Sequence, residues 1–427
     1  MKSQATTDGS GERELALEVL QQLRDAGFEA LWAGGCVRDL LLERAPQDYD
    51  VATSARPEEV RHLFGQRRTL AVGQAFGVII VMGRPPTQHV EVATFRRDLG
   101  YSDGRRPDAV EFSSAAEDAQ RRDFTINGLF LDPLTESVVD YVDGQADIEA
   151  RTIRAIGNPH DRFSEDKLRV LRAVRFATTL DFEIESRTWR AVCQRAAEID
   201  CVSAERVTAE LRKLMASEHR ARGLKLLIES GLLQQLLPEI DWQDAPQIER
   251  LLTHFSRTRG GSAEFTPLLA LVARHLPGDP ADTVTELGQR WRLTKAETQG
   301  VRWLLEHEAR IRTASDADWA EVQPLLVHPL GPTLVELVDV LDDGGDGVRF
   351  CRERLAWPAQ RLNPAPLLKG KDLTEAGIAP GPVYQEVLQE VRRAQLLEQL
   401  TTKQQALAWA KRIAAAKGPM DAERKKP

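Results

Sequence analysis

LWAGGCVRDLLLERAPQDYD, residues 31–50, predicts a strand, a glycine turn, a helix and a second strand in quick succession. The apolar residues of FEALWA are typical of a short strand, and the turn at Gly34 and Gly35 opens a helix through VRDLLLER. The second strand is DYDVAT, which begins at Asp48. Two further strands are predicted nearby, GVIIVMG at 77–83 and HVEVATF at 89–95. This alternation indicates an α+β fold for the N-terminal part of the chain.

Outside this stretch, the predicted secondary structure changes along the chain from mixed strands and helices to helices alone. Residues 1–12 are predicted to be a flexible leader, 12–27 a helix, and the polar, turn-rich stretch 96–111 a mobile loop. From about residue 146 onward the strand signals fade and one amphipathic helix follows another, among them ARGLKLLIESGLLQQLL at 221–237. We therefore expect an α+β head with a mixed β-sheet, followed by an all-helical remainder.

The composition is that of a folded protein of several domains. The chain has 427 residues, of which 42% are hydrophobic and 29% charged, and a formal net charge of −8. This charge argues against sequence-blind coating of nucleic acid, but it is compatible with a local basic patch. No apolar run reaches the ~18 residues of a membrane span, the N-terminus has no apolar signal region, and the four cysteines form no C-x-x-C pair. We therefore expect a cytoplasmic protein, neither secreted nor membrane-spanning.

Three carboxylates in the predicted strands suit a divalent cation. Asp48 and Asp50 are two apart in a strand-like segment, so both side chains lie on one face. Carboxylates side by side repel each other unless a cation lies between them, and oxygen ligands suit Mg²⁺. Glu91 alternates with Val90 and Val92, and it would complete a site for two metal ions. Taken alone, a D-x-D pattern is more often a polar strand end.

The glycine turn and a later arginine motif suit phosphate groups. Gly34 and Gly35 before a helix leave backbone N–H groups free for a phosphate, and Arg38 follows in the first helical turn. A pair of glycines alone is a weak signal, but the D-x-D pattern follows close behind it. AQRRDFTING adds paired arginines beside an aspartate, which suit ribose and triphosphate contacts as well as a solvated ion-pair cluster; these residues are Arg121, Arg122, Asp123 and Asn127.

RFSEDKLRVLRAVRF, residues 162–176, places an aspartate three positions before an arginine. On one helix Asp166 and Arg169 are neighbours, and an exposed salt bridge between them is worth at most about 1 kcal/mol. Cytosine and adenine both present an amino donor beside a ring-nitrogen acceptor, which an aspartate and an arginine side by side would match. Guanine and uracil would leave buried polar groups unpaired, at about 1–3 kcal/mol each. Arg172 and Arg175 are predicted phosphate contacts, although Arg175 equally suits a structural role.

These motifs together resemble a known family. GGCVRDLLLERAPQDYD, RRDFTING and RFSEDKLRVLRAVRF are similar to the class II tRNA nucleotidyltransferases and the bacterial poly(A) polymerases, over roughly residues 15–240. The resemblance implies a small nucleotidyltransferase head followed by an elongated helical neck, body and tail, which we place at 13–145, 146–220, 221–357 and 358–427. One departure is Gly128, where the family usually has alanine.

The resemblance also implies a role for each candidate residue. The implied groups are two Mg²⁺ ions at Asp48, Asp50 and Glu91; the triphosphate at Gly34, Gly35 and Arg38; the sugar and phosphates at Arg122, Asp123 and Asn127; and the base at Glu165, Asp166 and Arg169, which match the family's E-D-x-x-R motif. The implied activity is template-independent addition of C and A, from CTP and ATP, to the 3′ end of tRNA. Basic residues late in the chain would hold the tRNA backbone or form a solvated helix face; they are Arg392, Arg393, Lys411 and Arg412.

Rival functions share most of these residues. Poly(A) polymerases of the family carry a basic signature after the D-x-D strand, where this chain has Gln74 and Ala75, and this favours the tRNA enzyme. A form that adds only CC lacks part of the loop at 96–111, which is intact here, whereas a form that adds only A stays open. An RNA-binding protein without activity should have lost one of the three carboxylates. A metal phosphohydrolase would need histidines spaced to suit the pair at 160–161, and the sequence has none.

Overall fold

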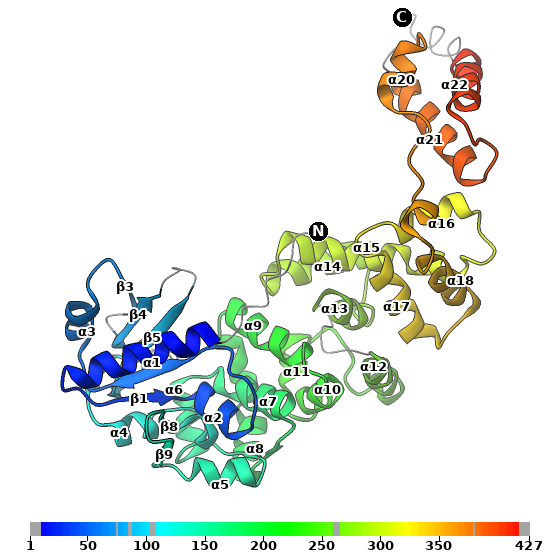
Figure 1. The fold of residues 1–427 in the computed structure, drawn as a ribbon. Helices are drawn as coiled ribbons and strands as arrows, with labels where there is room; N and C mark the ends of the chain where they lie inside the picture. Colours follow the sequence, from blue (N-terminus) through cyan, green and yellow to red (C-terminus); the bar gives the residue numbers. More distant parts are fainter. Residues whose placement is uncertain are drawn as a thin grey trace, which may run out of the picture. The chain divides into compact units, whose positions relative to one another are not determined.

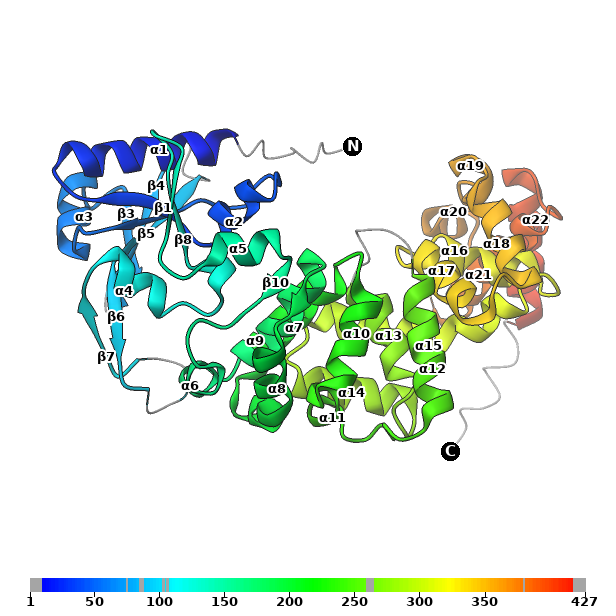
Figure 2. The ribbon, with the colours of Figure 1, turned by 90° about the horizontal axis from the view of Figure 1, so that it is seen from below.

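The structure is a computed structural model of the chain, and it describes residues 10–73, 76–83, 88–101, 104, 107–258, 265–378 and 381–417 (Figures 1 and 2). The chain divides near residue 248 into two compact units. The first unit contains every residue predicted to bind metal or nucleotide. The finer boundaries at 145, 220 and 357 stay a prediction.

A seven-stranded mixed sheet forms the centre of the first unit. Its strand order is β3-β4-β5-β2-β1-β8-β9, with β2 and β5 paired parallel and the other neighbours antiparallel. The predicted strands β1, β4 and β5 are confirmed, and so is β2, except that it begins at Asp50 and leaves Asp48 before the strand; β3, β8 and β9 were not expected from the sequence. The strands are β1 (Ala30–Ala33), β2 (Asp50–Thr53), β3 (Thr69–Gly73), β4 (Val78–Met82), β5 (His89–Thr94), β8 (Leu129–Asp132) and β9 (Ser137–Asp140).

The two faces of the sheet bury different side chains. Trp32 and Val51, paired across β1 and β2, lie on the face over which α1 (Ser10–Asp25) packs (Figure 1). On the other face Leu31 and Ala52 pack with residues of α4 (Ala115–Gln120). Helix α1 begins at Ser10, so the last residues of the expected leader are helical. Because side chains alternate along a strand, Asp50 and Glu91 lie on the same face as Ala52, the face that α4 covers.

The loop predicted at 96–111 is wrong in part, because its two arms form a hairpin. Strands β6 (Arg96–Leu99) and β7 (Ala109–Phe112) pair antiparallel, apart from the large sheet. Most of their side chains are partly or fully exposed, so neither strand shows the apolar alternation that marks a half-buried strand. Residues 102, 103, 105 and 106 between them lie outside the described residues.

Short helices continue the first unit after the sheet. The single helix predicted through residues 162–176 is wrong, because α6 (Pro159–Glu165) ends before Asp166 and α7 begins at Arg169. Residues 221–237 also form two helices, which separate at Gly231, where φ is +81°. The remaining helices of this unit are α2 (Gly35–Leu41), α3 (Pro57–Phe64), α5 (Gly144–Glu149), α7 (Arg169–Leu180), α8 (Ser186–Arg195), α9 (Ala204–Met215), α10 (Arg220–Glu229) and α11 (Leu232–Leu236). A small parallel pair, β10 (Thr152–Ile153) and β11 (Glu183–Ile184), lies among them.

The described residues of the second unit form helices, as predicted. They are α12 (Ala245–Arg257), whose first residues belong to the first unit, α13 (Phe265–Ala273), α14 (Pro280–Arg290), α15 (Lys295–Arg312), α16 (Trp319–Leu326), α17 (Gly331–Asp342), α18 (Asp346–Leu355), α19 (Ala359–Leu362), α20 (Gly370–Glu375), α21 (Pro382–Leu396) and α22 (Lys403–Lys417). The last three pack around a core of their own that includes Leu373, Val387 and Ala406. Among the described residues no single helix is long and apolar enough to cross a membrane; α16 and α17 meet that test only together, across a bend of 104°.

Candidate active site

A pocket of about 360 Å³ in the first unit gathers most of the candidate residues. Its wall combines the glycine turn, the start of β2, the arginine motif and the segment from Asp166 to Phe176. The predicted residues that line it are Gly34, Gly35, Arg38, Asp50, Arg122, Asp123, Asn127, Asp166, Arg169 and Arg172, and Arg121 and Phe176 complete the lining. Asp48, Glu91 and Arg175 are not part of this lining.

The pairing of β2 with β5 brings the predicted metal-binding carboxylates together. Val51 and Val92 are partners in the parallel pair, so Asp50 and Glu91, one residue earlier on each strand, are side by side. Burial raises the pKa of Asp50 to about 7, and repulsion from the charges of Asp48 and Glu91 adds to this, while Arg122 opposes it. Asp50 therefore senses the charges of both other carboxylates.

The chemistry of these three side chains fits Mg²⁺. No hydrogen bond or ion pair engages their carboxyl groups within the described part of the chain, so their oxygen lone pairs are available to a cation. The side chains do not converge as they stand: among the described residues, no group of three or more His, Cys, Asp or Glu side chains is close enough to hold an ion. Asp48 and Glu91 are exposed, so their side chains have room to change rotamer when a cation binds.

The glycine turn begins where β1 ends, next to Asp50. Ala33 is the partner of Asp50 across β1 and β2, and Gly34 then takes φ +73° and ψ −123°, a conformation that needs glycine. A Cβ on Gly34 would lie 2.8 Å from Arg122 Nη1. One turn into α2, Arg38 donates from Nη1 to Asn127 Oδ1 at 2.7 Å. The turn is thus joined directly to the arginine motif.

Asp118 fixes both arginines of the RRD motif, and sequence reasoning did not single it out. Its Oδ2 accepts from Arg122 Nε and Nη2 at 3.1 and 3.0 Å, and its Oδ1 accepts from Arg121 Nε at 2.9 Å. Asp118 is only 1% exposed, and although burial raises its pKa, Arg122 and Arg121 hold that pKa below the usual value. An aspartate four residues before an arginine, the spacing of an ion pair on a helix, was the available signal.

A chain of charged contacts runs from Asn127 to α9. Asn127 Nδ2 donates to Asp123 Oδ1 at 3.0 Å, and Arg172 donates from Nη2 to Asp123 Oδ2 at 2.6 Å. Glu210, on α9, then accepts from Arg172 Nη1 at 3.4 Å and from Arg175 Nε at 2.7 Å. Burial would raise the pKa of Asp123, but Arg172 and Asn127 bring it well below the usual value. Arg175, 8% exposed, is tied to Glu210 and lies over the ring of Phe176.

Asp166 and Arg169 do not pair with each other. Arg169 donates from Nη1 to Glu165 Oε2 at 2.6 Å and to the Arg162 carbonyl at 2.9 Å, and from Nη2 to the Arg121 carbonyl at 3.2 Å. Asp166 instead accepts two hydrogen bonds from Arg206 of α9, at 3.1 and 2.7 Å. The salt bridge considered from sequence is therefore wrong, and both side chains reach the pocket wall with partners of their own.

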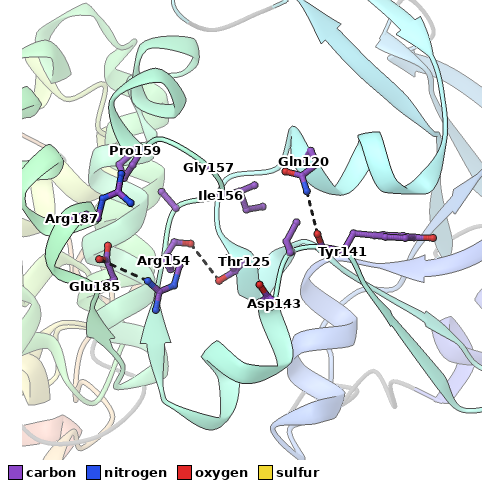
Figure 3. A pocket seen from close by; sticks show the side chains of 12 residues that line it. Gln120, Thr125, Tyr141, Asp143, Arg154, Ile156, Gly157, Pro159, Glu185 and Arg187 are labelled. Atoms are coloured by element: carbon purple, nitrogen blue, oxygen red, sulfur yellow. Dashed lines mark hydrogen bonds and ion pairs between the residues drawn. The ribbon is translucent and has the colours of Figure 1, made fainter.

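A second pocket, of about 260 Å³, shares the RRDFTING segment with the first (Figure 3). Gln120 and Thr125 line it, together with Tyr141 and Arg154. Figure 3 shows Gln120 donating to the Tyr141 carbonyl and Thr125 donating to the Arg154 carbonyl. Arg154 is itself paired with Asp147 and with Glu185, so its charge is already matched.

The late basic residues divide into two kinds. Arg392 donates to the Pro364 carbonyl at 2.7 Å, and Arg393 pairs with Asp318 at 2.7 Å, so both bind other parts of the second unit. Arg412 lies over the Trp409 ring, and Lys411 is exposed. The sequence signature weighed against poly(A) polymerases, Gln74 and Ala75, lies outside the described residues.

Family models define the class of protein to which this fold and pocket correspond. Residues 30–154 match the model described as the poly A polymerase head domain, which spans the sheet and the arginine motif. Residues 181–243 match the model described as a probable RNA and SrmB-binding site of polymerase A. The chain is thus a nucleotidyltransferase of the poly A polymerase type, with a mixed α+β head and a helical remainder.

Relatives narrow this class further. A CCA-adding enzyme of Lactococcus lactis subsp. lactis is 34% identical over 399 residues, which cover 92% of this chain and 95% of that protein. One of Enterococcus faecalis is 38% identical over 76% of each chain. The crystal structure of the Bacillus stearothermophilus CCA-adding enzyme in complex with CTP matches with a TM-score of 0.74 and 28% identity, over 97% of this chain and 99% of that one. The chain belongs to the CCA-adding enzyme family, and it is a tRNA nucleotidyltransferase.

Proposed function

We propose that this chain adds C and A to the 3′ end of tRNA at the pocket between the glycine turn and α7. The 3′-hydroxyl oxygen of the RNA bonds to the α-phosphorus of CTP or ATP, the bond from that phosphorus to the bridging oxygen breaks, and pyrophosphate leaves. The observation that carries this proposal is the pocket itself, because one wall holds groups suited to phosphates and another holds the aspartate and arginine suited to a base.

Asp48, Asp50 and Glu91 would hold two Mg²⁺ ions. The raised pKa of Asp50 and the absence of competing partners within the described residues support this assignment. Bound there, Mg²⁺ would activate the attacking hydroxyl and neutralise the negative charge that develops on the phosphate. The protein's own part is to present these carboxylates, without a hydrogen-bond or ion-pair partner among the described residues, beside the turn that would receive the nucleotide.

The nucleotide's triphosphate would lie over Gly34, Gly35 and Arg38. Arg38 keeps donors free beyond those it gives to Asn127 and Asp39, because a guanidinium has five. Arg122 and Asn127 would orient the sugar and the phosphates, each held in place by a neighbour described above. Arg172, on the same pocket wall, would add a phosphate contact. Arg175 does not line the pocket and would act only indirectly, through its ion pair with Glu210.

The base would be selected by Asp166 and Arg169. Arg169 uses three of its five N–H groups for Glu165 and two carbonyls, which leaves two donors in a fixed direction for a ring nitrogen. Asp166 would accept the amino group of cytosine or adenine. Guanine and uracil would place a carbonyl oxygen against the carboxylate and an N–H against the guanidinium, which costs about 1–3 kcal/mol for each unpaired group.

The variant Asp48→Ala tests the metal assignment. We expect incorporation of CMP and AMP into tRNA to fall almost to zero while the circular dichroism spectrum and melting temperature stay unchanged, because Asp48 is exposed. The exposed Asp161→Ala, whose carboxylate bonds only to Asn158 among the described residues, is a matched control. Substantial residual incorporation in Asp48→Ala would refute the role of this carboxylate.

Full CCA addition is distinguished from partial or poly(A) activity by the acceptor used. We expect the chain to complete tRNAs trimmed of A, CA or CCA when CTP and ATP are both supplied, and to stop after the last A. Long A tails on an unrelated RNA would indicate a poly(A) polymerase, and a tRNA completed only from its CC form would indicate an A-adding enzyme.

The four cysteines, all free, support a place in the reducing cytoplasm.

A further inference from the structure

Arg206 is the partner of the base-selecting carboxylate, although it comes from a different helix. Asp166 lies between α6 and α7, and Arg206 reaches it from α9. Arg206 Nη1 donates to Oδ1 at 3.1 Å and Nη2 to Oδ2 at 2.7 Å, the two parallel bonds of an arginine fork on a carboxylate. Both side chains are mostly buried, 24% and 16% exposed, so solvent weakens this pair less than it weakens a surface pair.

The fork leaves Asp166 with few free acceptor positions. A carboxylate accepts about four hydrogen bonds, two on each oxygen. Oδ1 already accepts from Arg206 and from the Leu168 backbone N–H at 3.1 Å, and Oδ2 accepts from Arg206. One position on Oδ2 is then left for a ligand, and its direction is fixed by the plane of the Arg206 guanidinium.

The same face of α9 supports the rest of this pocket wall. Glu210 follows Arg206 by four residues, one helical turn, and pairs with Arg172 and Arg175 of α7. Helices α7 and α9 are packed together, so the two contacts lie along one helix interface. Arg206 thus belongs to a rigid element that also orients the arginines beside the pocket, and its position does not depend on the short link that carries Asp166.

We propose that Arg206 is a positioning residue for base discrimination: it holds the Asp166 carboxylate so that a single acceptor faces the base. This rests on the proposed role of Asp166. An amino group of cytosine or adenine finds that acceptor, whereas the carbonyl of uracil or guanine meets a carboxylate that is unable to rotate away. Without Arg206 the carboxylate turns freely about its side-chain bonds and accommodates either kind of edge.

Single-turnover incorporation of each of the four nucleotides tests this inference. In Arg206→Met, which keeps the length and apolar stem of the side chain, the ratio of C to U incorporation and of A to G incorporation should fall by about tenfold or more. Arg206→Lys should give ratios between those of the wild type and those of Arg206→Met, because one ammonium group cannot bind both carboxylate oxygens in parallel. Arg190→Gln, on the exposed side of α8, serves as the matched control and should keep the wild-type ratios.

A purely structural role gives a different result. If Arg206 only supports the fold, incorporation of all four nucleotides slows by a common factor, and the C-to-U and A-to-G ratios stay unchanged. That outcome would overturn the inference. If Arg206→Met does not fold, Arg206→Lys decides by the same ratios.

The double variant separates this inference from the function on which it rests. In an Asp166→Asn background, Arg206→Met should change the ratios no further, because the two residues act through one carboxylate. If Asp166→Asn itself leaves discrimination intact, both the base-selecting role and the inference fail. If Asp166→Asn abolishes discrimination and Arg206→Met does not reduce it, the inference alone fails.

Discussion

Gly34→Ala separates backbone strain from the displacement of a pocket arginine. At φ +73° and ψ −123° a residue with a Cβ is strained, and such a conformation costs about 1–3 kcal/mol. The added Cβ would also lie 2.8 Å from Arg122 Nη1. Arg122 has little freedom to withdraw, since Asp118 binds its Nε and Nη2 and the Asn127 carbonyl accepts from its Nη1. The substitution should therefore shift Arg122 within the pocket as well as strain the turn.

Gly27→Ala is the matched control for the strain. Gly27 has φ +88°, yet no atom lies within 4 Å of a Cβ built there. Both variants should lower the melting temperature, by about 2–4 °C for each kcal/mol in a unit of this size. Only Gly34→Ala should also slow incorporation of C and A, by about 100-fold, because a misplacement near 1 Å at a reacting group has that effect.

Melting curves and single-turnover rates on the two variants decide the matter. Equal losses of rate in Gly34→Ala and Gly27→Ala would mean that general destabilisation, rather than the Arg122 position, controls activity. Full activity in Gly34→Ala would refute the claim that Arg122 packs too closely against the turn to accept a Cβ at position 34. Gly35→Ala, whose Cβ would lie 3.7 Å from Arg38 Nη2, should leave the melting temperature nearly unchanged.

Two further substitutions test the buried charges around the pocket. Glu210→Ala should lower the free energy of unfolding by about 3–5 kcal/mol in urea, because it leaves the Arg175 charge buried and unpaired; Glu210→Leu combined with Arg175→Met should recover most of the loss, and a fully stable Glu210→Ala would contradict this. Asp118→Asn should be destabilising at about pH 7 and less so near pH 3. A carboxylate whose pKa is lowered on folding stabilises above its unfolded pKa of about 3.9 and loses that contribution as the pH falls through its folded value. The exposed Glu111→Gln is its control and should leave the urea midpoint unchanged at both pH values.

The elements that could be predicted from sequence are those whose pattern reflects burial. Strand β5 shows apolar alternation because one face lies against α1, and that alternation put Glu91 on the side opposite Val90 and Val92. The hairpin of β6 and β7 was missed because its side chains are largely exposed, so its sequence resembles a polar loop. The break at Asp166 did have a signal. Its carboxylate accepts from the Leu168 N–H, the contact that aspartate typically makes before a helix.

The partners of the pocket residues could not be read from the sequence. Arg206 is 40 residues from Asp166, and Glu210 is 38 from Arg172. Each sits on an amphipathic helix whose polar face looks the same whether solvent or another helix covers it. Only the packing of α9 on α7 distinguishes the two cases. Opposite charges four residues apart, at Arg206 and Glu210, are a weak trace of this arrangement, because solvated helices carry such pairs as well.

The pairing of arginines with carboxylates bears on how an acidic protein would bind an anionic substrate selectively at the proposed site. Arg122, Arg169 and Arg172 line the pocket, and each has a carboxylate partner at 2.6–3.0 Å. The positive charge they offer is therefore partly cancelled, but the remaining N–H groups point in directions that the partner sets. Net charge attracts any phosphate equally, whereas fixed donors favour one arrangement of phosphate, sugar and base. If the proposed site is right, selection there depends on the carboxylates paired with the arginines as much as on the arginines themselves.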